Sequence, residues 1–337
     1  TVSASNAVAI GGYAGQYVGH SKEASYTTIV GDLAGQYTTG SNNTFMGYSA
    51  GKGGTTSAPY SSGTSNVAVG AYAFDGFTTG AGNVAIGYNT AGSATTANGL
   101  TAVGAYALDA NTGGYEVVAI GYNALGAETY AGHATAVGYS ALEDQNSAGN
   151  SYNTAVGSQV GRNITSGKNH TLIGYRAGQT MTTTAETVLI GSEAGYAINS
   201  TDANGTVAIG YQAGKAITVG IKNTAIGYQA LLNEDDGDFN TAVGYQALTN
   251  QEGKSGTVNN TAVGHRAGAS MTSGHDATLV GSNAGAAITT GMYNTIIGSN
   301  AADALTIGDY NTAVGVHALS SEDVGRGTTA IGYQSLY

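Results

Sequence analysis

The sequence has no cysteine and no tryptophan, a single proline, and only 9% charged residues. The absence of cysteine excludes disulfide bonds and thiol chemistry. No apolar run is long enough to span a bilayer, so we expect no membrane insertion. Positive charge is also scarce, and the net charge of −11 disfavours nucleic acid and anionic membranes as partners.

Glycine is abundant instead, with 55 residues in 337, and it recurs in a near-constant frame. We number each repeat from a marker glycine, which follows Val or Ile in 18 of 19 repeats, Met46 being the exception. The markers are Gly11, Gly31, Gly47, Gly70, Gly87, Gly104, Gly121, Gly138, Gly157, Gly174, Gly191, Gly210, Gly227, Gly244, Gly264, Gly281, Gly298, Gly315 and Gly332. Their spacing is mostly 17 residues. A short period along a whole chain indicates a solenoid, in which each unit packs only on its neighbours.

The repeat favours strands over helices, because two or three glycines per unit would each cost a helix about 1 kcal/mol and Val, Ile, Thr and Tyr prefer strands. We therefore predict an all-β parallel β-roll or β-helix solenoid of about 19 coils. We treat residues 1–337 as one elongated repeat domain, with its largest insertion at 51–65. The insertion falls on the side of the coil whose length varies. The segment around each marker has constant length, so we expect that segment to pack at a subunit interface.

Alternation along a strand assigns side chains to two faces. We predict that the large Val/Ile residue before the marker (position −1) fills the coil interior. The smaller Ala/Gly rank, with Ala most often at position −2, should then face a neighbouring subunit. The predicted structural core includes Ile209, Ile226, Val243 and Val263.

The rest of each unit suggests a second strand. Position +7 is often apolar, as in Phe77 and Ile217, and position +8 is often Thr. Position +10 is often Gly, as in Gly220, which we expect to adopt a positive φ in a turn. The Thr rank also raises the hypothesis of an ice-binding surface, although a single rank more simply stabilises stacked strands.

Segments such as Asn223 to Leu231, with the sequence Asn-Thr-Ala-Ile-Gly-Tyr-Gln-Ala-Leu, resemble repeats of bacteriophage tail fibres. They also resemble the head repeats of trimeric autotransporter adhesins. The resemblance covers essentially the whole chain. It implies a left-handed β-roll and a homotrimer packed about a common axis.

Three groups of residues are candidates for chemistry. Carboxylates around a glycine turn, Asp235, Asp236 and Asp238, are a weak calcium site, with a solvated loop as the simpler interpretation. The tyrosines directly after the marker, among them Tyr211, Tyr228 and Tyr245, could contact a glycan or form a structural ladder. The histidines are scattered without metal-binding spacing, and His265 takes the place of a tyrosine.

We therefore expect a non-enzymatic subunit of an extracellular virion or cell-surface fibre, which needs no cofactor. It would serve reach and attachment to a host or to a surface glycan. The alternatives are a filament that polymerises through end-to-end neighbours, a carbohydrate-processing tailspike and an ice-binding solenoid.

Overall fold

The computed structural model describes residues 6–18, 26–200, 203–252 and 255–337. They form a parallel β-solenoid with 23 short strands and no α-helix, as the repeat predicted. The chain divides into two compact units, Thr1–Asn169 and His170–Tyr337. Among the described residues, no helix is long and apolar enough to cross a membrane.

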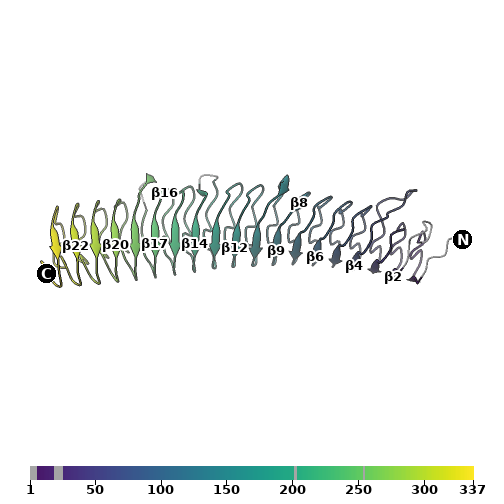
Figure 1. Cartoon of the computed structure of the whole chain (residues 1–337), viewed down its shortest axis with the longest axis horizontal. Coiled ribbons are helices and arrows are strands. Elements are labelled where there is room, and N and C mark those ends of the chain that lie inside the picture. Colours follow the sequence, from purple (N-terminus) through teal and green to yellow (C-terminus); the bar gives the residue numbers. More distant parts are fainter. Residues whose placement is uncertain (1–5, 19–25, 201–202, 253–254) are drawn as a thin grey trace. The chain divides into compact units, whose positions relative to one another are not determined.

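In the first unit, nine main strands pair in parallel in sequence order (Figure 1). They are β1 (Val8–Ile10), β2 (Thr28–Val30), β3 (Thr44–Met46), β4 (Val67–Val69), β5 (Val84–Ile86), β6 (Thr101–Val103), β7 (Val118–Ile120), β9 (Thr135–Val137) and β11 (Thr154–Val156). A separate pair is formed by β8 (Ala131–Gly132) and β10 (Gly149–Asn150).

The second unit repeats this arrangement with ten main strands. They are β12 (Thr171–Ile173), β13 (Val188–Ile190), β14 (Val207–Ile209), β15 (Thr224–Ile226), β17 (Thr241–Val243), β19 (Thr261–Val263), β20 (Thr278–Val280), β21 (Thr295–Ile297), β22 (Thr312–Val314) and β23 (Thr329–Ile331). Its separate pair is β16 (Gly237–Asp238) with β18 (Gly256–Thr257). Each main strand occupies positions −3 to −1 before its marker glycine.

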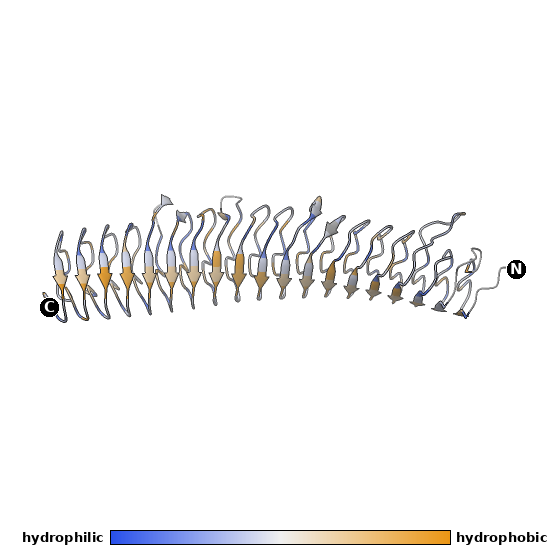
Figure 2. Ribbon diagram, viewed as in Figure 1, coloured by the Kyte–Doolittle hydropathy of each residue, from blue (hydrophilic) through white to orange (hydrophobic). Residues whose placement is uncertain are grey.

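The main strands face the coil interior with their middle residue, at position −2. From β2 to β23 this residue is at most 2% exposed, whether it is alanine or a larger residue such as Phe45. The large apolar residues at position +7 from Phe77 to Leu305, including Ile217, are also fully buried, which confirms that part of the prediction. The hydrophobic colour in Figure 2 is concentrated on these strands, and most of the connecting segments are more hydrophilic.

The assignment of the two strand faces was wrong. Ile209, Ile226 and Val243 are partly exposed and Val263 is 37% exposed, while their neighbours at position −2 are buried. The sequence interpretation placed the larger side chain inside, but the interior is already occupied by residues from positions +3, +4 and +7. Alanine at −2 fits the remaining space, so the β-branched residue points away from it.

The chain turns sharply after each marker through successive β-turns. In the coil after β17, Ala247 N–H donates to Gly244 O (3.4 Å) and Gln251 N–H to Leu248 O (3.1 Å). The marker glycines have φ between +120° and +144°, a region for glycine alone. A Cβ on Gly244 would also collide with the carbonyl oxygen of Gly264 in the next coil.

Packing inside a coil follows a volume rule between positions +4 and +7. In every repeat with a leucine at position +4, the residue at position −2 is alanine and the described residue at position +7 is polar. Examples are Leu108 with Asn111 and Leu231 with Glu234. Where +4 is glycine, +7 is often Ile or Met; a Cβ on Gly214 would lie only 2.8 Å from Ile217 Cδ1. In most of these coils, one large side chain from either +4 or +7 thus fills the same space.

The opposite side of each coil is mostly turns rather than the expected second strand. Regular pairing there is limited, in the described residues, to β8–β10, β16–β18 and isolated bridges. The glycines at position +10 also differ from expectation: Gly220 and Gly274 do not have positive φ. They are needed because a Cβ would lie 2.5 Å from Gly237 O and 2.6 Å from Gly291 O, respectively, in the next coil.

Candidate functional site

A regular feature of the surface is a ladder of β-branched side chains at position −1. In the second unit, in-register parallel pairing places Ile209 beside Ile226, Ile226 beside Val243 and Val243 beside Val263. The same register extends from Ile173 to Ile331. None of these side chains is buried, and Ile297 is 39% exposed. We call these ten residues the β-branched ladder; a contiguous exposed apolar surface of this kind is typical of an interaction site.

The tyrosines at position +1 stack on one another. Tyr211, Tyr228, Tyr245 and His265 have successive ring centroids 5.2, 5.2 and 5.3 Å apart, with interplanar angles of 19°, 8° and 10°. His265 therefore continues the tyrosine rank, as its position predicted. Both faces of Tyr228 and Tyr245 are covered by neighbouring rings. A sugar ring would need such a face, so this geometry supports the structural interpretation and weakens the glycan hypothesis for these residues.

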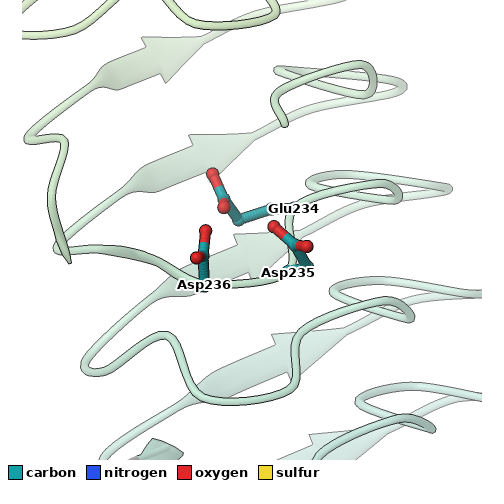
Figure 3. A group of neighbouring side chains, drawn as sticks. All are labelled: Glu234, Asp235 and Asp236. Atoms are coloured by element: carbon teal, nitrogen blue, oxygen red, sulfur yellow. The ribbon is translucent and has the colours of Figure 1, made fainter. Parts of the chain in front are cut away.

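The acidic loop contains one carboxylate cluster, formed by Glu234, Asp235 and Asp236 (Figure 3). One oxygen from each lies within 4.8 Å of the others. The predicted set included Asp238 in place of Glu234. Asp238 instead accepts a hydrogen bond from Ile221 N–H through Oδ1 (2.9 Å) and so fastens one coil to the previous one.

Glu234 is fully buried, and its carboxylate accepts hydrogen bonds from Gly237 N–H (2.7 Å) and Asn240 Nδ2 (3.3 Å). Burial raises its pKa to about 7, and Asp235 and Asp236 contribute in the same direction. The pKa of Asp235 is also raised, first by burial and then by Asp236. Oxygen ligands in such a cluster suit calcium, but both oxygens of Glu234 already accept hydrogen bonds from the chain, and the raised pKa means that its charged form is disfavoured. The geometry therefore does not strengthen the calcium hypothesis.

Glu128 is a second fully buried glutamate at position +7, the position that Glu234 occupies in its own coil. It accepts hydrogen bonds from Tyr130 N–H (3.0 Å), Gln145 Nε2 (3.1 Å), Ser147 N–H (3.1 Å) and Ser147 Oγ (3.3 Å). Glu128 and Glu234 both follow a leucine at +4, in coils that precede an expanded coil. The sequence interpretation missed this role, although a glutamate in a frequently apolar rank was a signal for it.

A ladder of buried asparagines at position −4 was also missed. Asn223 Nδ2 donates to Gly237 O (2.7 Å), and Asn223 Oδ1 accepts from Asn240 N–H (2.8 Å) in the next coil. Asn240 Oδ1 in turn accepts from Asn260 N–H (3.2 Å). One amide thus satisfies a carbonyl within its coil and an N–H of the next, which explains the recurrent Asn-Thr step.

Threonines at position +8 form a hydrogen-bonded ladder. Thr272 Oγ1 donates to Thr289 O (3.2 Å), Thr289 Oγ1 to Thr306 O (3.1 Å) and Thr306 Oγ1 to Asp323 O (2.8 Å). Their hydroxyl groups donate along the solenoid rather than toward solvent, as expected if this rank stabilises stacking.

No protein-family model and no curated protein sequence matches the chain.

Proposed function

We propose that the chain is a non-enzymatic structural subunit of an extended surface or virion fibre. It serves reach and attachment to a host or a surface glycan, and it works outside the cell as a homotrimer. The resemblance of its repeats to tail-fibre and adhesin-head repeats supports the trimer and a left-handed coil. The observation that carries the proposal is the exposed β-branched ladder.

The ladder suits packing between copies for two physical reasons. Val and Ile have few rotamers, so ordering them in an interface costs little conformational entropy. Full burial of such a side chain stabilises by about 1.5–3 kcal/mol. Because the ladder side chains are only partly buried in the single chain, burying the rest on association would contribute part of this free energy. Ten such residues in register in the second unit form one continuous apolar row for such a contact.

This interpretation reverses the predicted interface. Ala242 points into the coil and not toward a neighbour, so Ala242→Leu should disturb folding of the coil itself. Assembly should instead depend on the −1 residues. Fibre function also agrees with the ladders of Asn, Thr and Tyr, which tie each coil to the next and thus favour a stiff support.

The test is the mass of the native protein by light scattering after size-exclusion chromatography, with negative-stain images of the same fractions. We expect a trimer for the parent and dissociation or loss of assembly for the double variant Ile226→Lys/Val243→Lys. The matched control is Val219→Lys, because Val219 is 38% exposed and lies outside the ladder. A folded monomer at micromolar concentration for the parent would refute the trimer, and end-to-end strings in the images would favour the filament.

A further inference from the structure

A cleft of about 370 Å³ lies on the turn side of the second unit, away from the strands themselves. It is formed by the segments that follow β13, β14 and β15. Tyr196 lines it from the first of these coils, Ala216 from the middle one and Leu232 from the third. Backbone bonds hold the three coils together, from Ala197 N–H to Lys215 O (3.0 Å) and from Ala216 N–H to Leu232 O (3.1 Å).

Side-chain size explains the hollow. Tyr196 and Leu232 occupy position +5, where most other repeats carry a polar, charged or small residue. At the same position +5 the middle coil carries Lys215, whose ammonium lies against Glu193. Ala216 and Ala197, both at position +6, add two small side chains to the lining. Tyr196 and Leu232 are therefore two coils, or about 10 Å, apart, with Lys215 in the rank between them, and the slot of the cleft lies beside the two alanines.

The polar groups of the cleft are held in place by neighbours. Lys215 Nζ lies 2.7 Å from Glu193 Oε2. Gln212 Nε2 donates to the same carboxylate oxygen (2.9 Å) and Gln212 Oε1 accepts from Gln229 Nε2 (3.0 Å). An ammonium has three donors, so Lys215 retains N–H groups beyond the one directed at Glu193. Asn233, which is exposed, adds an amide at the rim.

This combination selects a class of ligand. The flat ring of Tyr196 and the side chain of Leu232 suit the C–H face of a pyranose, and amide and ammonium groups suit its hydroxyls. The charge of Lys215 is balanced by Glu193, which argues for a neutral ligand over an anionic one. We propose that this cleft binds one pyranose ring of a neutral glycan. The proposal rests on the glycan-attachment part of the proposed function and gives it a site distinct from Tyr211, Tyr228 and Tyr245.

The test is saturation-transfer NMR and calorimetry with methyl β-glucopyranoside, methyl β-galactopyranoside and N-acetylglucosamine. Sodium glucuronate serves as an anionic comparison, and an oligosaccharide of the best sugar distinguishes a free monosaccharide from a polymer as ligand. We expect saturable binding of at least one neutral sugar, with a Kd of about 1 mM, as suits a shallow cleft. Glucuronate should bind more weakly.

Two variants locate the binding. Ala216→Leu fills the slot and Tyr196→Ala removes the ring, and each should weaken binding by about tenfold or more. Tyr175→Ala is the control, because Tyr175 is an exposed tyrosine of the same unit outside the cleft (45% exposed). If a variant fails to fold, chemical-shift changes of the Ala216 and Leu232 methyl groups in the parent report the same contact. No binding of any neutral sugar, or binding that neither variant weakens and that leaves these methyl groups unshifted, overturns the proposal. Because the assay does not depend on assembly, its failure leaves the trimer test unaffected.

Discussion

The imidazole of His170 hydrogen-bonds to the hydroxyl of Thr187 in the next coil, with Nδ1 and Oγ1 2.8 Å apart. Its other nitrogen, Nε2, lies 2.8 Å from the carbonyl oxygen of Thr184. His170 stands at position −4, the place of the asparagine ladder, and it is 1% exposed. A neutral histidine thus replaces the asparagine amide, with one ring nitrogen for each partner.

His170 makes stability depend on pH. Burial lowers its pKa from 6.5 to about 4. Between these two pH values the histidine is protonated in the unfolded chain but neutral in the folded chain. Stability is therefore complete above about pH 6.5 and falls as the pH drops toward 4, by up to about 3 kcal/mol. Over the same pH range Glu234 contributes in the opposite direction, so the effect of His170 is measured as a difference between the parent and His170→Asn by urea unfolding at pH 7 and pH 4.5. Lowering the pH should cost the parent more stability than it costs His170→Asn, and the same pH dependence in both proteins would contradict the assignment.

Glu234 should act in the opposite direction. Because burial raises its pKa from 4.5 to about 7, the folded state holds a proton that the unfolded state releases between these values. Its contribution is present below about pH 4.5 and is lost as the pH rises through 7. We expect Glu234→Gln to be more stable than the parent at pH 8, by about 1–3 kcal/mol, and similar to it at pH 4.5. Glu252→Gln, an exposed carboxylate nearby in sequence, is the control for net charge.

The volume rule predicts a compensating pair. Gly214→Leu alone should destabilise by about 1–3 kcal/mol, because its side chain meets Ile217. Adding Ile217→Asn should recover part of this loss, since it recreates the Leu108 and Asn111 arrangement, in which Asn111 Oδ1 accepts from Gly114 N–H (3.1 Å). Thermal melts of both single variants and the double variant give the coupling. Strict additivity would show that the two positions do not share one space.

The asparagine ladder should be costly to interrupt. Asn223→Ala leaves Gly237 O and Asn240 N–H without their partner, and each unpaired buried group costs about 1–3 kcal/mol. Asn233→Ala should have little effect, because its bond to Asn250 is exposed. Urea midpoints measure the difference. A similar small shift for both variants would mean that water replaces the ladder amide.

The acidic loop should be dispensable for stability. We expect Asp235→Asn/Asp236→Asn to fold like the parent and to melt at an equal or higher temperature, because two close carboxylates are removed. A chelator should leave the melting temperature of the parent unchanged. If the chelator lowers the melting temperature of the parent, and the double variant melts equally low without the chelator, the calcium site would be established.

The fold class followed from the marker glycines because a fixed period constrains the architecture directly. Which strand face is buried did not follow, because Val243 and Ala242 were compared by size alone. The deciding information lay at positions +3, +4 and +7, where Ala247, Leu248 and Gln251 are fully buried and fill the interior beside Ala242. Glu234 was overlooked for a related reason: a buried carboxyl inside a coil is visible in sequence only once positions +4 and +7 are considered together.

The pairing of β3 with β4 holds its register, with Phe45 beside Ala68, although the insertion at 51–65 separates these strands. The position of a main strand is therefore independent of how much chain connects it to the next. Such a framework can lengthen its connections by evolution or by design without realigning its sheet. Foreign peptides placed in this segment should be displayed on an intact solenoid.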